Sequence, residues 1–279
     1  MHPVEASEAH SRAIPAPVLR ALLRVPPLSR AAVTLHTMNV DQAELKTIVS
    51  VLGTDPALSA LVLRLVNSPL FGVRSPVTGI LHAVALLGLD RLRVLASTAA
   101  LRMHVSTALA TPALTNCWRH SVACGLATQD IAVKSGFNGD LAYTAGLLHD
   151  IGCFGALACW PGEYSHLLAT CHPADLLHRE VEVLGVTHTD AGAVLLQHWN
   201  LPSPLVEVAR EHHCPSPGPQ SRLVELVSRG CRLADAIGFG LTANHSDDHT
   251  AEDMLSRLVT DQDAFYFRIC DGINQMEYL

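Results

Sequence analysis

Apolar residues recur at intervals of three and four along most of the chain, and this spacing restricts the fold more than any other feature. A period of about 3.6 places such residues on one face of a helix. Segments in which valine, isoleucine and threonine alternate with polar residues, as in half-buried strands, are absent from the sequence. We therefore expect an all-α protein. In the first part of the chain the pattern is carried by Leu19, Leu22, Leu23, Leu45, Ile48, Val49, Leu52, Leu58, Leu61, Val62 and Leu65.

Capping residues and prolines divide this pattern into short helices. Asp55-Pro56 predicts a helix start, with the carboxylate as N-cap and the proline in the first turn. Ser75-Pro76 predicts another start by the same logic, and Gly88 predicts a break before the next helix. In the second half of the chain we expect helices at about residues 116–135, 140–151, 161–171, 173–183, 190–199, 204–213 and 221–239.

The length of 279 residues suits one large helical core or two smaller helical lobes packed together. Residues 1–14 are polar and without a pattern, which predicts a flexible N-terminal arm. The segment 107–115 contains proline and small residues and is the predicted connector. We therefore expect an N-terminal helical lobe at 15–110, a second lobe at 111–240 and a helical extension at 241–279.

Composition excludes several classes of protein. Apolar residues make up 49% and charged residues 16% of the chain, as in ordered globular proteins. The net charge of −7 argues against a nucleic-acid partner. No apolar stretch reaches the roughly 18 residues of a membrane span. The N-terminus has no secretory signal pattern, and the eight cysteines form no CxxC pair. We expect a cytoplasmic protein with reduced cysteines and no membrane partner.

The segment Gly146–Gly152 delivers an imidazole and a carboxylate side by side, as His149 and Asp150, after small apolar residues. Mixed nitrogen and oxygen ligation suits a divalent transition metal. Gly152 is expected to end the helix in a left-handed conformation, so that both side chains converge on one point. A two-residue motif is a weak signal, and a buried hydrogen-bonded His-Asp pair explains it equally well.

Further histidines and one acid in apolar surroundings favour a shared site over unrelated core residues. A buried imidazole needs a hydrogen-bond partner, and an unpaired buried carboxylate is costly. The predicted helix that contains His120 places it on an apolar stripe with Cys117 and Cys124. Together with the doublet, the candidates for one metal site are His120, His149, Asp150, His188, His212, His213 and Asp235.

This arrangement resembles the HD superfamily, in which a His, a His-Asp doublet and a distant Asp bind metal. The resemblance assigns these positions to His120, His149, Asp150 and Asp235. Metal-binding members such as the HD-GYP phosphodiesterases have further histidines between the doublet and the last Asp. Their counterparts here are His188, His212 and His213.

The resemblance to the HDOD branch is closer and covers the chain from about Val25 to Asp235. It implies an HD-like helical bundle with an N-terminal helical lobe packed on it. It also implies a regulatory output module of bacterial signal transduction that acts through a signalling protein partner. The resemblance is carried by Val25-Pro26-Pro27-Leu28, Asp55-Pro56-Ala57-Leu58, Leu65-Val66-Asn67-Ser68-Pro69-Leu70-Phe71-Gly72 and Ala83-Val84-Ala85-Leu86-Leu87-Gly88-Leu89.

Three departures from the HD-GYP pattern lower the expectation of cyclic-dinucleotide hydrolysis. The Lys expected three residues after the Asp of the doublet is Cys153, which cannot supply positive charge to a phosphate. The Gly-Tyr-Pro motif after His213 is replaced by Cys214-Pro215-Ser216-Pro217. Asn116 stands where some three-metal sites have a Glu. A site for one or two divalent ions, with Fe, Mn or Zn as candidates, remains the expectation.

Three functions follow from these features. The first is a regulatory module whose metal, if bound, stabilises the second lobe. The alternative is a metal-dependent phosphohydrolase acting on a nucleotide or cyclic dinucleotide, with Asp150 as the bridging catalytic carboxylate. In it, Arg119 and Arg210 are candidate substrate-binding residues, although ordinary surface arginines explain them more simply. The third is a helical scaffold without metal. Cys153 is a candidate soft ligand or redox-sensitive thiol, with a packed thiol favoured.

Overall fold

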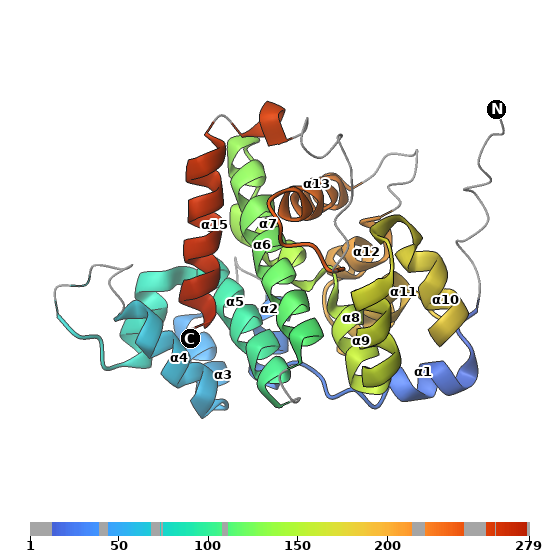
Figure 1. Ribbon diagram of the computed structural model, residues 1–279. Coiled ribbons are helices and arrows are strands. Elements are labelled where there is room, and N and C mark those ends of the chain that lie inside the picture. The colour runs from blue at the N-terminus through green and yellow to red at the C-terminus, as the bar shows by residue number, and fades with distance from the viewer. Residues whose placement is uncertain are drawn as a thin grey trace.

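The computed structural model describes residues 13–38, 44–67, 73, 75–107, 111–213, 221–242, 255–259 and 261–277. These residues form helices joined by turns, and this described part contains no strand, so the all-α prediction is confirmed (Figure 1). The first helices along the chain are α1 (Ala16–Leu22), α2 (Arg30–Thr37), α3 (Leu45–Gly53), α4 (Pro56–Val66) and α5 (Ile80–Thr107).

The helices of the second half start with α6 (Pro112–Lys134). They continue through α7 (Gly139–Leu148), α8 (Ile151–Cys159), α9 (Pro161–Thr170), the 3₁₀ turn η2 (Pro173–Asp175), α10 (Leu176–Leu184), α11 (His188–His198), α12 (Ser203–Glu211), α13 (Arg222–Ala236) and α15 (Gln262–Glu277). The predicted helical character of the segment after residue 241 is confirmed for α15, which packs along α6 (Figure 1).

Helix α5 is the spine of the N-terminal half, because α2, α3 and α4 all pack against it. It bends at Gly88, which has φ 73° and ψ 168°, so the predicted break at this glycine is confirmed. The N-cap at Asp55 is also confirmed, since its Oδ1 accepts a hydrogen bond of 3.0 Å from the amide of Leu58.

The helix start predicted at Ser75-Pro76 is wrong, because α5 begins only at Ile80. The Asn67 side chain explains the difference. Its Oδ1 accepts a 2.7 Å hydrogen bond from the amide of Val77, and its Nδ2 donates a 2.8 Å bond to the Val77 carbonyl. These contacts engage both backbone groups of Val77 that a helix would use, and they hold the segment in an extended form.

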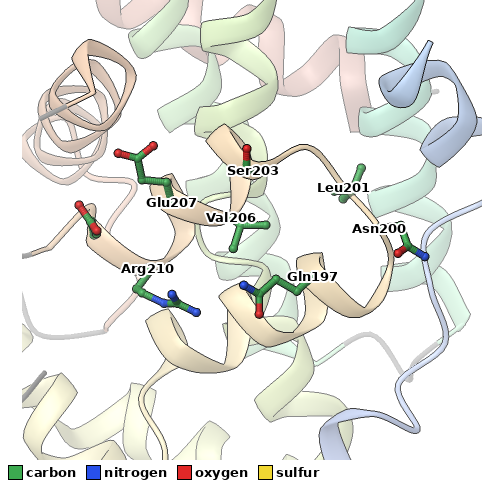
Figure 2. A pocket seen from close by; sticks show the side chains of 8 residues that line it. Gln197, Asn200, Leu201, Ser203, Val206, Glu207 and Arg210 are labelled. Atoms are coloured by element: carbon green, nitrogen blue, oxygen red, sulfur yellow. The ribbon is translucent and has the colours of Figure 1, made fainter. Parts of the chain in front are cut away.

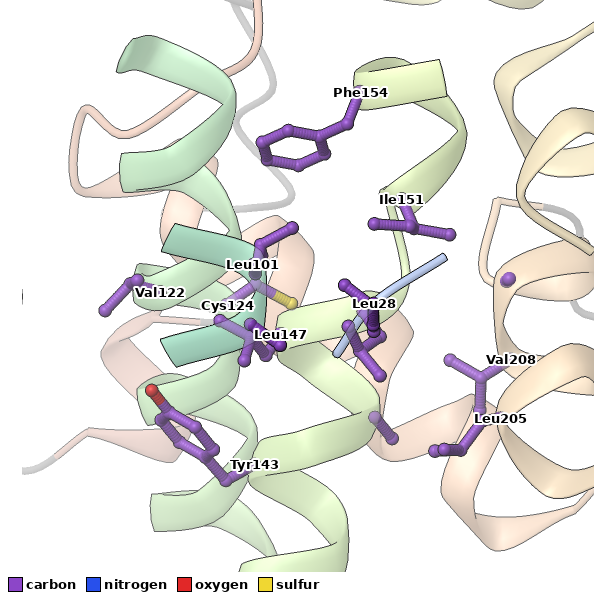
Figure 3. Packing of buried hydrophobic residues seen from close by; sticks show 14 of the residues in the cluster. Leu28, Leu101, Val122, Cys124, Tyr143, Leu147, Ile151, Phe154, Leu205 and Val208 are labelled. Carbon is purple, nitrogen blue, oxygen red and sulfur yellow. The ribbon is translucent and has the colours of Figure 1, made fainter. Parts of the chain in front are cut away.

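In the second half, α6 lies against α7 and α13, while α8 packs on α11 and α11 on α12. The predicted connector is helical from Pro112, with Thr111 as N-cap, whereas residues 108–110 lie outside the described part. Helix α1 comes first in the chain but packs against α8 and α11. Buried apolar residues of both halves form one continuous core, which includes Leu28, Leu101, Leu147 and Phe154 (Figure 3). The lobe boundaries stay a prediction, and most of the predicted N-terminal arm lies outside the described residues.

One helical stretch, Gly139–Cys159, is long and apolar enough by composition to cross a membrane. It comprises α7, α8 and the break between them. In the fold, 89% of its most apolar window is buried inside the protein. It therefore has the surroundings of a core element, packed against α6 and α11.

Candidate metal centre

The His149-Asp150 doublet lies at a break between two helices. Residues 140–151 are predicted as one helix, which is wrong, because α7 ends at Leu148 and α8 begins at Ile151. The predicted left-handed conformation of Gly152 is also wrong, since its φ is not positive and it lies within α8. The break turns the chain so that His149 and Asp150, both fully buried, face the interior of the bundle.

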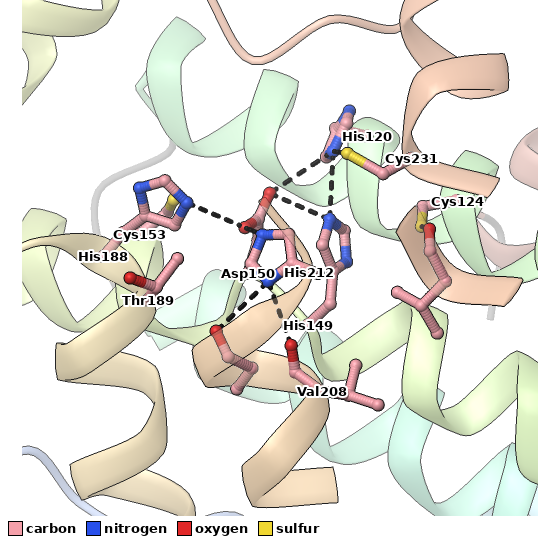
Figure 4. A network of polar contacts seen from close by, with 12 residues as sticks. His120, Cys124, His149, Asp150, Cys153, His188, Thr189, Val208, His212 and Cys231 are labelled. Carbon is pink, nitrogen blue, oxygen red and sulfur yellow. Dashed lines mark hydrogen bonds and ion pairs between the residues drawn. The ribbon is translucent and has the colours of Figure 1, made fainter. Parts of the chain in front are cut away.

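The Asp150 carboxylate faces a different set of ligand atoms with each of its oxygens. On the Oδ2 side, the Nε2 atoms of His120 and His149 lie at 3.3 and 3.1 Å (Figure 4). These two Nε2 atoms are 3.3 Å apart. The sulfur of Cys231, from α13, lies 3.6 Å from Nε2 of His120 and completes this group. We call His120, His149 and Cys231, with Oδ2, the Oδ2 group.

On the other side, Oδ1 of Asp150 lies 3.4 Å from Nε2 of His188 and 3.1 Å from Nε2 of His212. His188 begins α11, and His212 follows the end of α12. His213 joins them, with its ring centre 5.0 Å from that of His188 and 4.3 Å from that of His212. We call His188, His212 and His213, with Oδ1, the Oδ1 group.

The four buried imidazoles share one orientation, in which Nδ1 is hydrogen-bonded outward and Nε2 points to the carboxylate. The Nδ1 atoms of His120 and His149 donate to the carbonyls of Phe239, at 2.7 Å, and Gly146, at 2.6 Å. The Nδ1 atom of His188 is hydrogen-bonded to the Glu180 carboxylate. The Nδ1 atom of His212 is hydrogen-bonded to the carbonyls of Val208 and Ala209. A proton on each Nδ1 leaves a lone pair on each Nε2, as metal ligation requires.

The unpaired acceptors at the centre fit cations. Among the described residues, the buried Nε2 atoms of His188 and His212 and both oxygens of Asp150 have no hydrogen-bond partner. Buried acceptors without donors are costly. Ligand atoms at roughly 2.0 to 2.2 Å from one ion lie about 3.0 to 3.5 Å from each other. The 3.1 to 3.4 Å separations around Asp150 fall within that range.

The electrostatics of the centre also favour positive charge. Burial opposes ionisation of Asp150, but the facing imidazoles outweigh it and hold the pKa of this carboxyl well below its usual range. Burial likewise works to lower the pKa of His149, yet the Asp150 carboxylate outweighs it and raises that pKa. Burial, reinforced by the neighbouring imidazoles, lowers the pKa of His212 to about 4, so this ring is neutral at neutral pH.

Glu180 is a functional residue that the sequence analysis missed. This fully buried carboxylate on α10 accepts hydrogen bonds from the Nδ1 and backbone N–H of His188 and from the Tyr164 hydroxyl at 2.6 Å. A carboxylate behind a ligating histidine fixes the orientation of the ring and raises its basicity. The sequence feature that could have identified Glu180 is its spacing: it lies four residues from both Leu176 and Leu184, on the buried stripe of α10.

Two glycines allow the helices of the centre to approach each other. A Cβ on Gly152 of α8 would lie 1.9 Å from the backbone oxygen of His188, so only glycine allows α11 to lie this close to the doublet. A Cβ on Gly230 of α13 would lie 2.0 Å from Oγ1 of Thr128 on α6. Asp150 lies two residues before Gly152, and Cys231 directly follows Gly230. The two close contacts therefore place both residues at the centre.

Asp235 is a predicted ligand that the structure places outside both groups. Its side chain is 39% exposed, and its Oδ1 lies 3.5 Å from Nδ1 of His120, on the side of the ring away from Asp150. Cys231, one helical turn earlier on α13, lies on the Nε2 side instead. The sequence analysis did not single out this cysteine, although it shares a helix face with Asp235. A ligand role for Asp235 stays a prediction.

The predicted substrate-binding arginines are both exposed. Arg119 is exposed on α6, next to the buried His120. Arg210 is exposed on α12 and lines a cavity of about 510 Å³ together with Gln197 and Glu207 (Figure 2). Cys153 is fully buried on α8, with its sulfur 3.2 Å from the Tyr164 hydroxyl, which agrees with a packed thiol. The roles proposed for the two arginines stay predictions.

Comparison with known proteins gives matches of sequence and of fold. The family model of the HDOD domain matches residues 25–215. An uncharacterized protein of Treponema pallidum (strain Nichols) is 30% identical over 175 residues, which cover 61% of this chain and 34% of that protein. The chain thus spans about a third of the length of this relative.

Solved structures share the fold at low sequence identity. An HDOD domain protein of unknown function from Geobacter sulfurreducens has a TM-score of 0.72 and 22% identity, covering 93% of this chain and 95% of its own. A protein of Shewanella amazonensis SB2B, provisionally named a phosphohydrolase, has a TM-score of 0.68 and 24% identity, and the match covers 94% of this chain and 97% of that protein. A second protein of that organism, provisionally named a metal-dependent phosphohydrolase, has a TM-score of 0.61 and 20% identity, covering 92% and 96%. Because the family model spans residues 25–215, more than half of the chain, the protein belongs to the HDOD family.

Proposed function

We propose that this HDOD protein is a signal-transduction output module in which the two ligand groups that share Asp150 would hold divalent cations and so keep the second half of the molecule in its working shape. The observation that carries the proposal is the buried carboxylate of Asp150, whose two oxygens face two separate groups of ligand atoms. One carboxylate can bridge two ions in this way. Fe, Mn and Zn all accept imidazole and carboxylate ligands.

The proposed ions would join helices that are far apart in the sequence. The Oδ2 group draws on α6, the break after α7, and α13, while the Oδ1 group draws on α11 and the end of α12. A divalent ion at either group supplies positive charge and Lewis acidity. Since binding of an ion favours only the folded arrangement, it couples metal occupancy to the relative positions of these helices.

The surroundings of the centre favour regulation over turnover. His120, His149, Asp150, His188 and His212 are each at most 3% exposed. Phosphoryl transfer needs positive charge where negative charge develops. The position three residues after Asp150 holds the buried Cys153, and the two lysines of the sequence are Lys46 on α3 and Lys134 at the end of α6. We propose that the partner is another signalling protein and that the module works in the bacterial cytoplasm.

Elemental analysis of protein purified without a histidine tag tests this proposal. We expect about one ion of Fe, Mn or Zn for each of the two ligand groups, and loss of metal-dependent stability after chelation. Protein that takes up no metal when refolded with each of these ions would overturn the proposal.

Hydrolysis is a second candidate function, because divalent ions held by the two groups that share Asp150 would supply the Lewis acidity that hydrolysis of a phosphate ester requires. Metal-loaded protein should be assayed with cyclic dinucleotides and nucleotide monophosphates. Turnover that disappears in His149→Ala would establish the phosphohydrolase function in place of the purely regulatory one. Turnover that survives in this variant would come from another source.

A further inference from the structure

Cys231 contributes a buried sulfur to the Oδ2 group. The residue is 5% exposed, and its Sγ lies 3.6 Å from Nε2 of His120. The ligand atoms of His120, His149 and Cys231 lie within 4.8 Å of one another. Figure 4 shows the sulfur and the two rings converging beside Asp150. This group therefore contains two imidazole nitrogens, one carboxylate oxygen and one sulfur.

Packing of α13 against α6 sets the position of this sulfur. The close contact of Gly230 with Thr128 fixes α13 against α6 at the residue that precedes Cys231. Asp235 lies one turn further along α13 and meets His120 only at Nδ1, which already has the Phe239 carbonyl as a partner at 2.7 Å. The sulfur thus lies on the lone-pair side of the ring, and the carboxylate of Asp235 lies on the other side.

We propose that the Cys231 thiolate is the fourth protein ligand of the ion in the Oδ2 group, beside His120, His149 and Oδ2 of Asp150. The inference rests on the proposed metal centre and adds a difference between its two positions. The Oδ1 group offers three imidazoles and one oxygen, while the Oδ2 group offers a softer set that includes sulfur.

The ligand chemistry predicts which ions each position selects. Binding of a divalent ion at Cys231 replaces the thiol proton, which leaves to solvent, and forms a metal–sulfur bond without any change of oxidation state. Thiolate favours Zn²⁺, Fe²⁺ and Co²⁺ over the harder Mn²⁺ and Mg²⁺. The Oδ2 group should therefore retain Zn²⁺ in the presence of excess Mn²⁺, while the Oδ1 group exchanges more readily.

Cobalt substitution tests this assignment in the full chain. Co²⁺ bound to thiolate has a near-ultraviolet charge-transfer band that nitrogen and oxygen ligands do not produce. We expect the band in wild-type protein loaded with Co²⁺, and its loss in Cys231→Ser together with a roughly 10- to 100-fold weaker retention of one ion. The matched control is Cys171→Ser, which removes another buried sulfur. That sulfur lies 3.3 Å from the His172 carbonyl and belongs to neither ligand group.

Each outcome separates this inference from the metal centre itself. Two bound Co²⁺ ions without a thiolate band, or a band that persists in Cys231→Ser, would overturn the role of Cys231 and leave the metal centre standing. No bound Co²⁺ at all would overturn both. Cys231→Asp restores an oxygen ligand, so it should keep both ions and lose the band.

A measurement on unmodified protein removes any dependence on how the variants fold. X-ray absorption of the Zn²⁺-loaded wild-type chain should show a sulfur neighbour at about 2.3 Å from zinc. A spectrum that needs only nitrogen and oxygen neighbours would overturn the assignment.

Discussion

Each of the four buried imidazoles of the candidate centre is oriented by a partner on the side away from Asp150. Backbone carbonyls perform this task for His120, His149 and His212, and the Glu180 carboxylate performs it for His188. The carbonyls for His149 and His212 belong to the helix that precedes the ring, whereas those for His120 and His188 come from other parts of the chain: the Phe239 carbonyl follows α13, and Glu180 lies on α10. The two types of partner therefore respond differently to mutation.

Asp150→Asn should remove both ions, because the amide keeps the shape of the side chain but loses the charge that both groups share. We expect metal affinity to fall by at least roughly 10- to 100-fold at each position. Elemental analysis after dialysis measures this, and circular dichroism checks that the helices remain. Asp130→Asn is the control, since that carboxylate pairs with Lys134 on the surface of α6. Full metal content in Asp150→Asn would contradict a bridging role.

Glu180→Gln should affect one position only. The amide cannot accept in the same way from Nδ1 and the backbone N–H of His188 and from Tyr164, so His188 loses its orientation. We expect roughly 10- to 100-fold weaker binding of the ion in the Oδ1 group, with the other ion retained. The matched control is Glu182→Gln on the same helix, where the exposed carboxylate pairs with Arg179. Titration with Zn²⁺ followed by calorimetry separates the two binding steps, and equal weakening of both would count against the assignment.

Single residues of the centre could be predicted from the sequence where a polar side chain stands out in an apolar segment. His120, His149 and Asp150 stand out in this way, and the structure brings them together. Cys231 could not be identified by that criterion, because a cysteine is an ordinary core residue. Asp235 was expected because it is an acid among apolar residues and because it fits the family pattern. The direction of its side chain depends on the contact between α13 and α6, which no spacing within one helix reveals.

At the scale of elements, the centre depends on a break between α7 and α8 and on the close contact of α8 with α11. The contact depends on a small residue, because the space at Gly152 has room for a hydrogen atom and for nothing larger. His149 and Asp150 lie in the break between α7 and α8, and their side chains face the neighbouring helices.

Gly152→Ala should push α8 and α11 apart, because the added Cβ would lie 1.9 Å from the backbone oxygen of His188. We expect a loss of roughly 1 to 3 kcal/mol in the free energy of unfolding, measured by urea denaturation, together with reduced metal content in the Oδ1 group. Gly162→Ala, in α9, is the control, since nothing lies within 4 Å of the added atom. Unchanged stability in Gly152→Ala would show that α8 can shift without harm.

The elements themselves could largely be predicted, and the exceptions have local causes. Periodicity and caps identify the α4 start at Asp55 and the bend of α5 at Gly88. The start at Ser75-Pro76 fails because Asn67, ten residues before Val77, binds the backbone there. The prediction of one helix over 140–151 misses the break at the doublet, because apolar residues continue on both sides of it and the periodicity has no gap. The first error comes from a side-chain contact that outweighs the local pattern, and the second comes from a pattern that contains no signal for the break.

For the whole molecule, the continuous core and the placement of α1 against α8 and α11 join the beginning of the chain to the helices of the metal centre. Leu22 at the end of α1 is fully buried there, near Gly155 of α8. If the proposed ions shifted α8 or α11 on binding, these packed side chains would link that shift to the N-terminal helices.

Removal of metal should lower the melting temperature of the whole chain in one transition. An ion present at about 100 times its dissociation constant adds about 2.7 kcal/mol, and about 1 kcal/mol shifts the midpoint of a chain near this size by roughly 2 to 4 °C. We expect a fall of at least roughly 5 °C after treatment with a chelator, reversed by Zn²⁺, in thermal unfolding followed by circular dichroism. A melting temperature that does not respond to either addition would contradict a structural role for the ions.

His213 is the exposed member of the two groups, and the other ligand residues are buried. In the proposed centre, a chelator or a competing ion would therefore reach the His213 side first, whereas the position beside Cys231 is lined by buried residues of α6 and α13. Removal of metal would then pass through a form with one ion, in which the Oδ1 group is empty and the Oδ2 group is still occupied. A protein with this sequence of release has three occupancy states rather than two, and so could report graded metal supply to its partner.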